Sequence, residues 1–163
     1  MMPDTARADA WKPVLTAATE EARRRGDRRL GTDHLLLGLL HDGVSPAATA
    51  LGVSLAEARA AADTLDRAAL AAIGIQIQSR AGPAPAPFGR RFPPLTSGTK
   101  AVLKRAAQEA RPIGRRRIGP AHFLLALLAG QRPDPAAELL DALGVDRAAV
   151  RQRLGGPAGG GAA

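Results

Sequence analysis

The chain has 163 residues, a net charge of +8 at pH 7 and a hydrophobic content of 45%. This length suits one domain, or two small repeats that share a core. Only 2% of the residues are aromatic and none is a cysteine, so we expect an aliphatic core without disulfide bonds or thiolate chemistry. Abundant Ala and Leu, with almost no strand-forming runs, favour an all-α fold.

The sequence shows no targeting or membrane segment. Residues 1–10 are polar and lack the apolar stretch of a secretory signal. No run approaches the ~18 apolar residues of a membrane span. We therefore expect a cytoplasmic protein with no membrane partner. The positive charge attracts polyanions in general, so it does not by itself distinguish nucleic acid, acidic lipid and phosphorylated protein.

In chain order, four helices are predicted in the first half. They run from about Asp9 to Arg25, from Thr32 through the apolar run 35–40, from Pro46 to Leu51, and from Ser54 to about Ala72. Thr32 is the expected N-cap of the second helix, and Asp33 lies in its first turn. Ser54 and Glu57 form a predicted capping box. The second helix is apolar on nearly every side, so we expect it at the centre of the fold.

An internal repeat extends this pattern to the second half. Leu30–Leu40 reads Leu-Gly-Thr-Asp-His-Leu-Leu-Leu-Gly-Leu-Leu, and Ile118–Leu128, 88 residues later, reads Ile-Gly-Pro-Ala-His-Phe-Leu-Leu-Ala-Leu-Leu. The flanks match too: Glu-Ala-Arg at 21–23 and 109–111, and Leu-Gly-Val at 51–53 and 143–145. The second copy is predicted to form helices at about 98–111, 121–129, 135–143 and 146–154.

The expected organisation is two pseudo-symmetric four-helix repeats in one compact bundle of eight helices. We place an N-terminal extension at 1–8, the repeats at 9–73 and 96–154, and a disordered tail at 155–163. Residues 74–95 are rich in proline and glycine and are expected to link the repeats.

Catalytic chemistry is not indicated. The sequence has no phosphate-binding loop, no strand to carry a dinucleotide fingerprint and no nucleophile beside a base, so we expect neither an enzyme nor a cofactor. His34 and His41 are seven positions apart without a His-Glu-x-x-His motif, so no metal site is expected. His34 and His122 open the two buried helices. They either contact a ligand or tie a neighbouring loop through a backbone hydrogen bond, and we favour the loop.

The motif at 31–40, Gly-Thr-Asp-His-Leu-Leu-Leu-Gly-Leu-Leu, resembles the signature of the Clp N-terminal repeat domain of ClpC- and ClpA-type unfoldases. The Glu20–Arg23 stretch and the Leu-Gly-Val segments are similar to that family as well. The resemblance covers about 9–154 and occurs twice. It implies a non-catalytic module that docks Clp substrates and adaptors. We expect a stand-alone form without the ATPase modules, similar to small actinobacterial relatives, and the Ala-Arg-Gly-Pro bias fits a GC-rich genome.

The resemblance further implies a phosphoarginine site, because ClpC-type members read this mark. Thr32 and Asp33 would then supply it: the helix N-terminus offers N–H donors to the phosphate, and the carboxylate binds the guanidinium. Asp33 is one methylene shorter than the family's Glu. The second copy has Pro120-Ala121 and lacks both groups, so we expect one site. The alternative role of Thr32 and Asp33 is a helix cap alone.

A groove between the repeats is a second expectation from the resemblance. Leu95, Thr96 and Lys100 match the positions where the family binds partners and, in some actinobacterial homologues, cyclic-peptide antibiotics. Phe88 and Phe92 in the linker either plug this groove or pin the linker to the core, and pinning is the commoner outcome. Sequestration of such antibiotics is therefore an alternative function.

Two basic clusters precede the buried helices: Arg23, Arg24, Arg25, Arg28 and Arg29, and then Arg115, Arg116 and Arg117. They either recruit phosphate or an acidic partner surface, or form a solvated face. A nucleic-acid binder is the weaker alternative, because stacking aromatics and a clear recognition helix are lacking. We expect a monomer whose partners are Clp unfoldase or protease components, or their substrates and adaptors.

Overall fold

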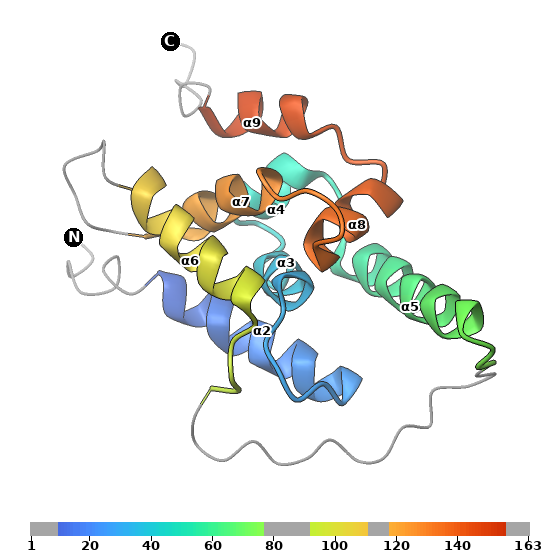
Figure 1. Ribbon diagram of the computed structural model, residues 1–163. Helices are drawn as coiled ribbons and strands as arrows, with labels where there is room; N and C mark the ends of the chain where they lie inside the picture. Colours follow the sequence, from blue (N-terminus) through green and yellow to red (C-terminus); the bar gives the residue numbers. More distant parts are fainter. Residues whose placement is uncertain (1–9, 77–91, 111–117, 156–163) are drawn as a thin grey trace, which may run out of the picture.

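The computed structural model describes residues 10–76, 92–110 and 118–155. These residues form eight helices, labelled α2 to α9 in Figure 1. The helices are α2 (Trp11–Arg25), α3 (Thr32–Leu40), α4 (Pro46–Leu51), α5 (Leu55–Ala72), α6 (Ser97–Glu109), α7 (Pro120–Leu128), α8 (Pro135–Ala142) and α9 (Arg147–Gly155). The predicted all-α fold is confirmed, and each helix end differs from the expected one by two residues or fewer.

Local sequence sets most of the helix ends. The predicted capping box of α5 is present: the Ser54 N–H donates to Glu57 Oε2 at 2.7 Å, and the Glu57 N–H donates to Ser54 Oγ at 3.1 Å. Helix α2 stops at Gly26, whose φ of 75° lies in the left-handed region. The prediction for α3 was wrong in one respect. Its N-cap is Gly31, and Thr32 is its first helical residue.

The core is mainly aliphatic, with Phe123 as a buried aromatic side chain, and is built around α3 and α7. Leu35, Leu36 and Leu37 of α3 are completely buried, as is Leu124 of α7. Helix α3 lies in the middle of Figure 1 and contacts α2, α5, α6, α7 and α8. The expectation of a buried second helix is thus confirmed. No helix in the described part of the chain combines the length and the apolarity that crossing a bilayer requires.

The third and fourth helices of each repeat pack against the other repeat as well as against their own. Helix α4 of the first repeat packs against α7 and α9 of the second. Helix α8 of the second repeat packs in the same way against α3 and α5 of the first. The repeats therefore form one interlocked core, and side chains from both halves of the sequence meet at the same places.

A short backbone ladder also joins the halves. Leu30 and Leu95 form an isolated parallel bridge. The Leu30 N–H donates to Pro94 O at 2.9 Å, and the Thr96 N–H donates to Leu30 O at 3.1 Å. The Thr99 hydroxyl donates to the same carbonyl at 2.8 Å. This ladder fixes the loop before α3 against the segment that enters α6.

The expectation for the linker aromatics needs correction. Phe88 lies outside the described residues. The side chain of Phe92 is 53% exposed, so Phe92 does not pin the linker to the core. The neighbouring Pro93 is buried instead, and Leu95 packs against the core. Because the backbone bonds to Leu30 already hold this segment, no aromatic anchor is needed there.

Candidate functional site

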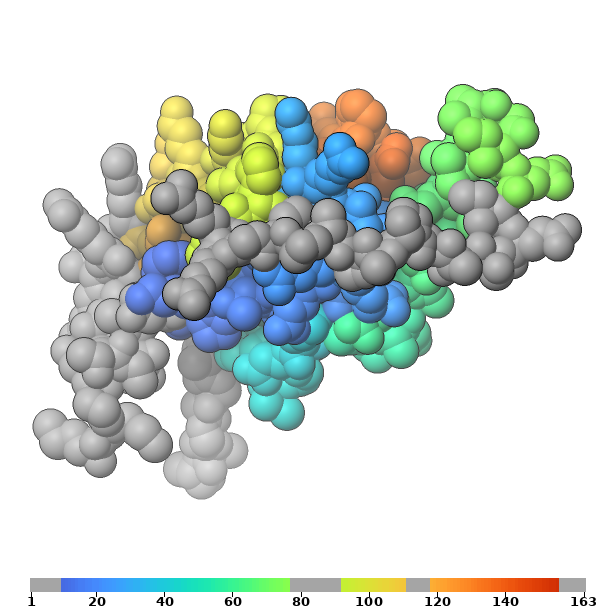
Figure 2. Space-filling view, turned by 90° about the horizontal axis from the view of Figure 1, so that it is seen from below, coloured from blue at the N-terminus to red at the C-terminus, as the bar shows by residue number. Residues whose placement is uncertain are grey.

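A cleft of about 520 Å³ lies where the two repeats meet. Its walls come from the α2–α3 loop, α5, the residue before α6, and α8. Figure 2 shows the α2–α3 segment, in light blue, between the first part of α6 and α5. Ala62, Leu65 and Leu139 form an apolar wall, and charged side chains from the α2–α3 loop and α5 face it. The cleft is thus an amphipathic site at the repeat junction.

Arg25 is the centre of the charge network in this cleft. Its Nη1 lies 2.5 Å from Asp33 Oδ2, and its Nη2 lies 2.6 Å from Asp66 Oδ2. Nε is 3.6 Å from Asp27 Oδ2. The arginine side chain is only 8% exposed. Burial acts to lower the pKa of Arg25, but Asp33 and Asp66 outweigh it and raise that pKa above the ordinary value. Arg25 therefore stays charged and does not belong to a solvated basic face.

The two repeat histidines hold the loops before their helices. His34 is 3% exposed, and its Nδ1 accepts the Gly31 N–H at 2.9 Å. The neutral ring then carries its proton on Nε2, which donates to Asp27 Oδ2 at 2.9 Å. In the second repeat, His122 Nδ1 accepts the Gly119 N–H at 3.0 Å. The prediction that these histidines tie a loop by a backbone hydrogen bond is confirmed.

Thr32 and Asp33 point to different places. The Thr32 hydroxyl donates to Asp134 Oδ1 at 2.8 Å and accepts the Ala136 N–H at 3.1 Å, and the residue is 1% exposed. It therefore faces α8 and does not line the cleft. The Asp33 side chain, 15% exposed, does line the cleft and is paired with Arg25 there.

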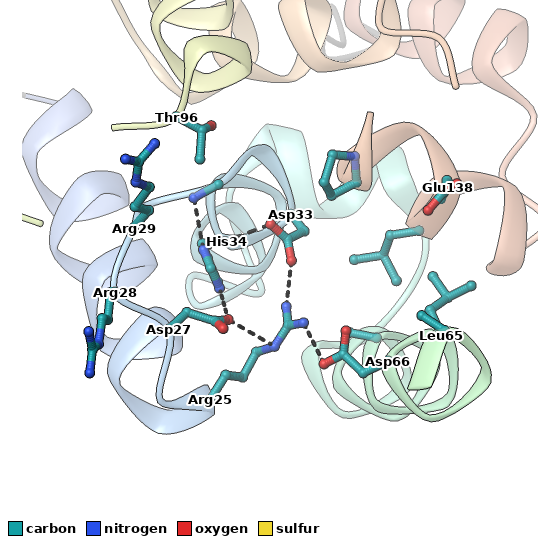
Figure 3. A pocket seen from close by; sticks show the side chains of 15 residues that line it. Arg25, Asp27, Arg28, Arg29, Asp33, His34, Leu65, Asp66, Thr96 and Glu138 are labelled. Carbon is teal, nitrogen blue, oxygen red and sulfur yellow. Dashed lines mark hydrogen bonds and ion pairs between the residues drawn. The ribbon is translucent and has the colours of Figure 1, made fainter. Parts of the chain in front are cut away.

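Arg28 and Arg29 supply unpaired positive charge at the cleft. Both are exposed, and within the described residues neither forms an ion pair. Figure 3 shows them on one side of the cleft, with Asp66, Leu65 and Glu138 on the other. The cleft therefore presents free cations along one side and carboxylates along the other.

Sequence reasoning found part of this site and missed part. Asp33, Thr96, Arg28 and Arg29 were predicted as candidates, and they all line the cleft. Asp66 and Glu138 were missed, because they reach the cleft only through tertiary packing: Asp66 comes from α5 of the same repeat, and Glu138 comes from α8 of the other. Arg25 was noticed as one of a basic cluster, but its i to i+8 pairing with Asp33 spans a turn and has no sequence signal.

Other predicted residues lie elsewhere. Leu95, Lys100 and Arg24 do not line the cleft, and Arg115, Arg116 and Arg117 fall outside the described residues. Across 10–76, 92–110 and 118–155, no group of three or more His, Asp and Glu side chains is arranged to hold a metal ion.

Comparison with known proteins decides the family. The sequence matches the Clp repeat (R) N-terminal domain over residues 8–143, with a second match over 95–159. The chain belongs to the Clp N-terminal domain family. Chloroplastic ClpC2 of Oryza sativa subsp. japonica and chloroplastic ClpC1 of Arabidopsis thaliana are each 32% identical to it over 144 residues. The match covers 86% of this chain and 14% of each relative, so the chain spans a small part of their length.

A solved structure supports the same fold. The N-terminal domain of the chaperone ClpD from Arabidopsis thaliana has a TM-score of 0.63 and 22% identity, and covers 95% of this chain and 99% of its own. At this identity the likeness concerns the fold. Membership in the family places the chain among the N-terminal docking domains of Clp unfoldases.

Proposed function

We propose that this Clp N-terminal domain binds protein segments of Clp proteolysis, substrates or adaptors, in the cleft at the start of α3. One observation carries this proposal. Arg28 and Arg29, which have no ion pair among the described residues, line the same cleft as Asp33 and an apolar wall at the repeat junction. An extended segment lying there would meet apolar contacts along the wall and charge-assisted hydrogen bonds at its sides.

Phosphoarginine is the ligand we propose for this cleft. Its guanidinium would face Asp33 and Asp66, and its phosphate would face Arg28 or Arg29 near the N-terminus of α3. Arg25 competes for the same carboxylates, because it already contacts Asp33 and Asp66. The ligand must therefore share these carboxylates with Arg25 or displace it. We propose one such site, since Pro120-Ala121 offers no carboxylate in the second repeat.

Isothermal titration calorimetry tests this proposal. The ligands are free phosphoarginine, a peptide that carries it, and the same peptide with plain arginine. We expect Arg28→Gln with Arg29→Gln to weaken binding of the phosphoarginine peptide by roughly tenfold or more, because two charge-assisted bonds are lost. Asp33→Ala is expected to weaken it as well.

The matched control removes two exposed cations elsewhere, Lys12→Gln with Arg67→Gln. It is expected to keep the affinity of the parent protein. Equal losses in both double variants would show that net charge alone drives binding, which contradicts a site at the cleft. Absence of binding by the parent protein would rule out the phosphoarginine form of the proposal, and a pull-down against a Clp unfoldase would then test the docking function by itself.

Exposed Phe92 favours a second candidate, binding of a Clp-targeting cyclic-peptide antibiotic at Leu95, Thr96 and Lys100. Phe92 is 53% exposed and lies three residues before Leu95, so an apolar ligand at this segment would cover it. Titration with such an antibiotic is expected to show weaker binding for Phe92→Ser and Lys100→Gln. Unchanged affinity in both variants would remove this candidate.

A further inference from the structure

The two repeats differ where their first and second helices cross. At Gly38 of α3, an added Cβ would lie 2.7 Å from Val14 O and 2.8 Å from Ala18 N, so α2 approaches α3 through the space that glycine leaves. The equivalent position of α7 is occupied by Ala126, which is buried. There a methyl group stands where α3 has only the hydrogen of Gly38.

A second cleft, of about 410 Å³, lies at this crossing in the second repeat. Val102 of α6 and Ala126 and Leu127 of α7 form its apolar floor. Lys104 and Arg105 of α6 line its rim. It shares no lining residue with the cleft at the start of α3. The position at which the repeats differ, Gly38 in the first and Ala126 in the second, therefore lies at a second cleft that is distinct from the first.

The free charge at this second cleft is positive. Lys104 and Arg105 are exposed, and neither forms an ion pair with any residue that the structure describes. Asp134, the acid in the lining, is already engaged: its Oδ1 accepts the Thr32 hydroxyl at 2.8 Å and its Oδ2 accepts the Ala137 N–H at 3.2 Å. In the first cleft, by contrast, carboxylates face the free arginines.

We propose that the second cleft is a docking surface for an acidic segment of a partner protein. Carboxylates of the segment pair with Lys104 and Arg105, and a small apolar side chain between them lies on the Ala126–Leu127 floor. An apolar floor without aromatic rings suits a peptide and offers no stacking platform for bases. This proposal extends the docking function proposed above. It rests on that function in one respect, namely that the partner is a protein.

Fluorescence anisotropy with synthetic probes tests the proposal. The probe is a labelled dodecapeptide that alternates Glu with Ala and Leu, and its reference has Gln in place of every Glu. We expect the full chain to bind the Glu probe and not the Gln reference. Lys104→Gln with Arg105→Gln is expected to weaken binding by roughly tenfold or more. Ala101→Trp, at an exposed position of the lining, is expected to block the cleft and weaken binding without disturbing the core.

Lys12→Gln with Arg67→Gln is the charge-matched control and is expected to bind like the parent protein. Circular dichroism melting confirms that each variant folds. The proposal is overturned if the Glu probe does not bind, if the control weakens binding as much as the cleft variant, or if an oligothymidylate of the same length binds more tightly than the peptide.

The same variants separate this proposal from the function of the first cleft. Lys104→Gln with Arg105→Gln is expected to keep phosphoarginine binding, whereas Arg28→Gln with Arg29→Gln is expected to keep binding of the Glu probe. A parent protein that binds the Glu probe but not phosphoarginine would contradict the phosphoarginine proposal for the first cleft alone. A parent protein that binds phosphoarginine but not the Glu probe would contradict the second cleft alone.

Discussion

The hydroxyl of Thr32 and the carboxylate of Asp134 are joined by a hydrogen bond of 2.8 Å that connects the first residue of α3 to the N-cap of α8. The same hydroxyl accepts the Ala136 N–H at 3.1 Å, while Asp134 accepts the Ala137 N–H at 3.2 Å. Two backbone donors at the start of α8 are thus satisfied, one by each repeat.

Thr32→Ala is expected to lower the free energy of unfolding by about 2 kcal/mol, because it leaves the buried Ala136 N–H without an acceptor. Thr32→Ser keeps the hydroxyl, so its free energy of unfolding is expected to decrease much less. Urea unfolding measures both. The control is Thr64→Ala on the exposed face of α5, expected within about 0.5 kcal/mol of the parent. Equal losses at Thr32 and Thr64 would contradict the capping role.

Gly38→Ala is expected to lower the free energy of unfolding by about 2 kcal/mol, because the new methyl group would meet the backbone of α2, which cannot move aside easily. Thermal melting followed by circular dichroism measures the change. At Gly43 an added Cβ has no atom within 4 Å, so Gly43→Ala is the matched control and is expected to be nearly neutral. A harmless Gly38→Ala would refute the close crossing.

Glu21 forms a buried ionic cluster with His41 and Arg59. The carboxylate is 1% exposed, lies 2.7 Å from His41 Nε2 and accepts hydrogen bonds from Arg59. Burial alone would raise the pKa of Glu21, but the hydrogen bonds and charges of Arg59 and His41 outweigh it and lower the pKa below 4.5. The carboxylate form is thus favoured by folding.

Because the pKa of Glu21 is lower in the folded chain than in the unfolded one, this cluster stabilises fully above the unfolded value of about 4.5 and loses its effect as the pH falls through the folded value. Glu21→Gln is expected to lower the free energy of unfolding by about 3 kcal/mol at pH 7. It is also expected to reduce the decrease of that free energy at acid pH. Urea unfolding across pH values measures this, with exposed Glu20→Gln as control. If the free energy of unfolding of Glu21→Gln decreased at acid pH as much as that of the parent protein, the lowered pKa of Glu21 would be contradicted.

Arg147 binds several groups at the ends of α7 and α8. Its guanidinium donates to Gly130 O, to Ala137 O at 3.1 Å and to Asp141 Oδ1 at 3.0 Å. A lysine cannot reach these acceptors together, because it lacks the planar fork. Arg147→Lys is therefore expected to lower the free energy of unfolding by about 1 to 2 kcal/mol in a urea titration. An unchanged free energy of unfolding in Arg147→Lys would show that a positive charge at this position is sufficient without the guanidinium geometry.

Arg25→Gln tests how the first cleft is regulated. Removing the internal guanidinium takes away the ion pair of Asp33, so the affinity for a phosphoarginine peptide is expected to rise several-fold in calorimetry, by roughly 1 kcal/mol. Stability is expected to fall, because three acids lose a common cation. Weaker ligand binding in a folded Arg25→Gln variant would instead indicate that Arg25 helps to hold the ligand.

Helix positions were predictable because their signals are local. Ser54 and Glu57 cap α5 as their spacing indicates. Thr32 shows where local reasoning stops. A threonine before an apolar run is typical of an N-cap, yet Gly31 takes that position and His34 accepts its N–H, while the Thr32 hydroxyl finds partners 102 and 104 positions away.

The site was predictable to a similar extent. Asp33, Arg28 and Arg29 lie on one contiguous stretch, so the repeat motif drew attention to them together. Asp66 and Glu138 come from α5 and α8, and nothing in their own surroundings marks them. Their positions follow from the packing of α5 against α8, which depends on the whole fold.

The packing of the third and fourth helices across the repeats gives the molecule the arrangement of a symmetric dimer. A single repeat on its own would leave part of the inner faces of its last two helices uncovered, whereas two identical copies would cover each other through the same α4–α9 and α5–α8 contacts. The molecule thus has the layout of a homodimer whose two subunits are joined in one chain. Because the two halves of one chain differ in sequence, the molecule can carry two unlike clefts, one in which carboxylates face the arginines and one lined by unopposed cations.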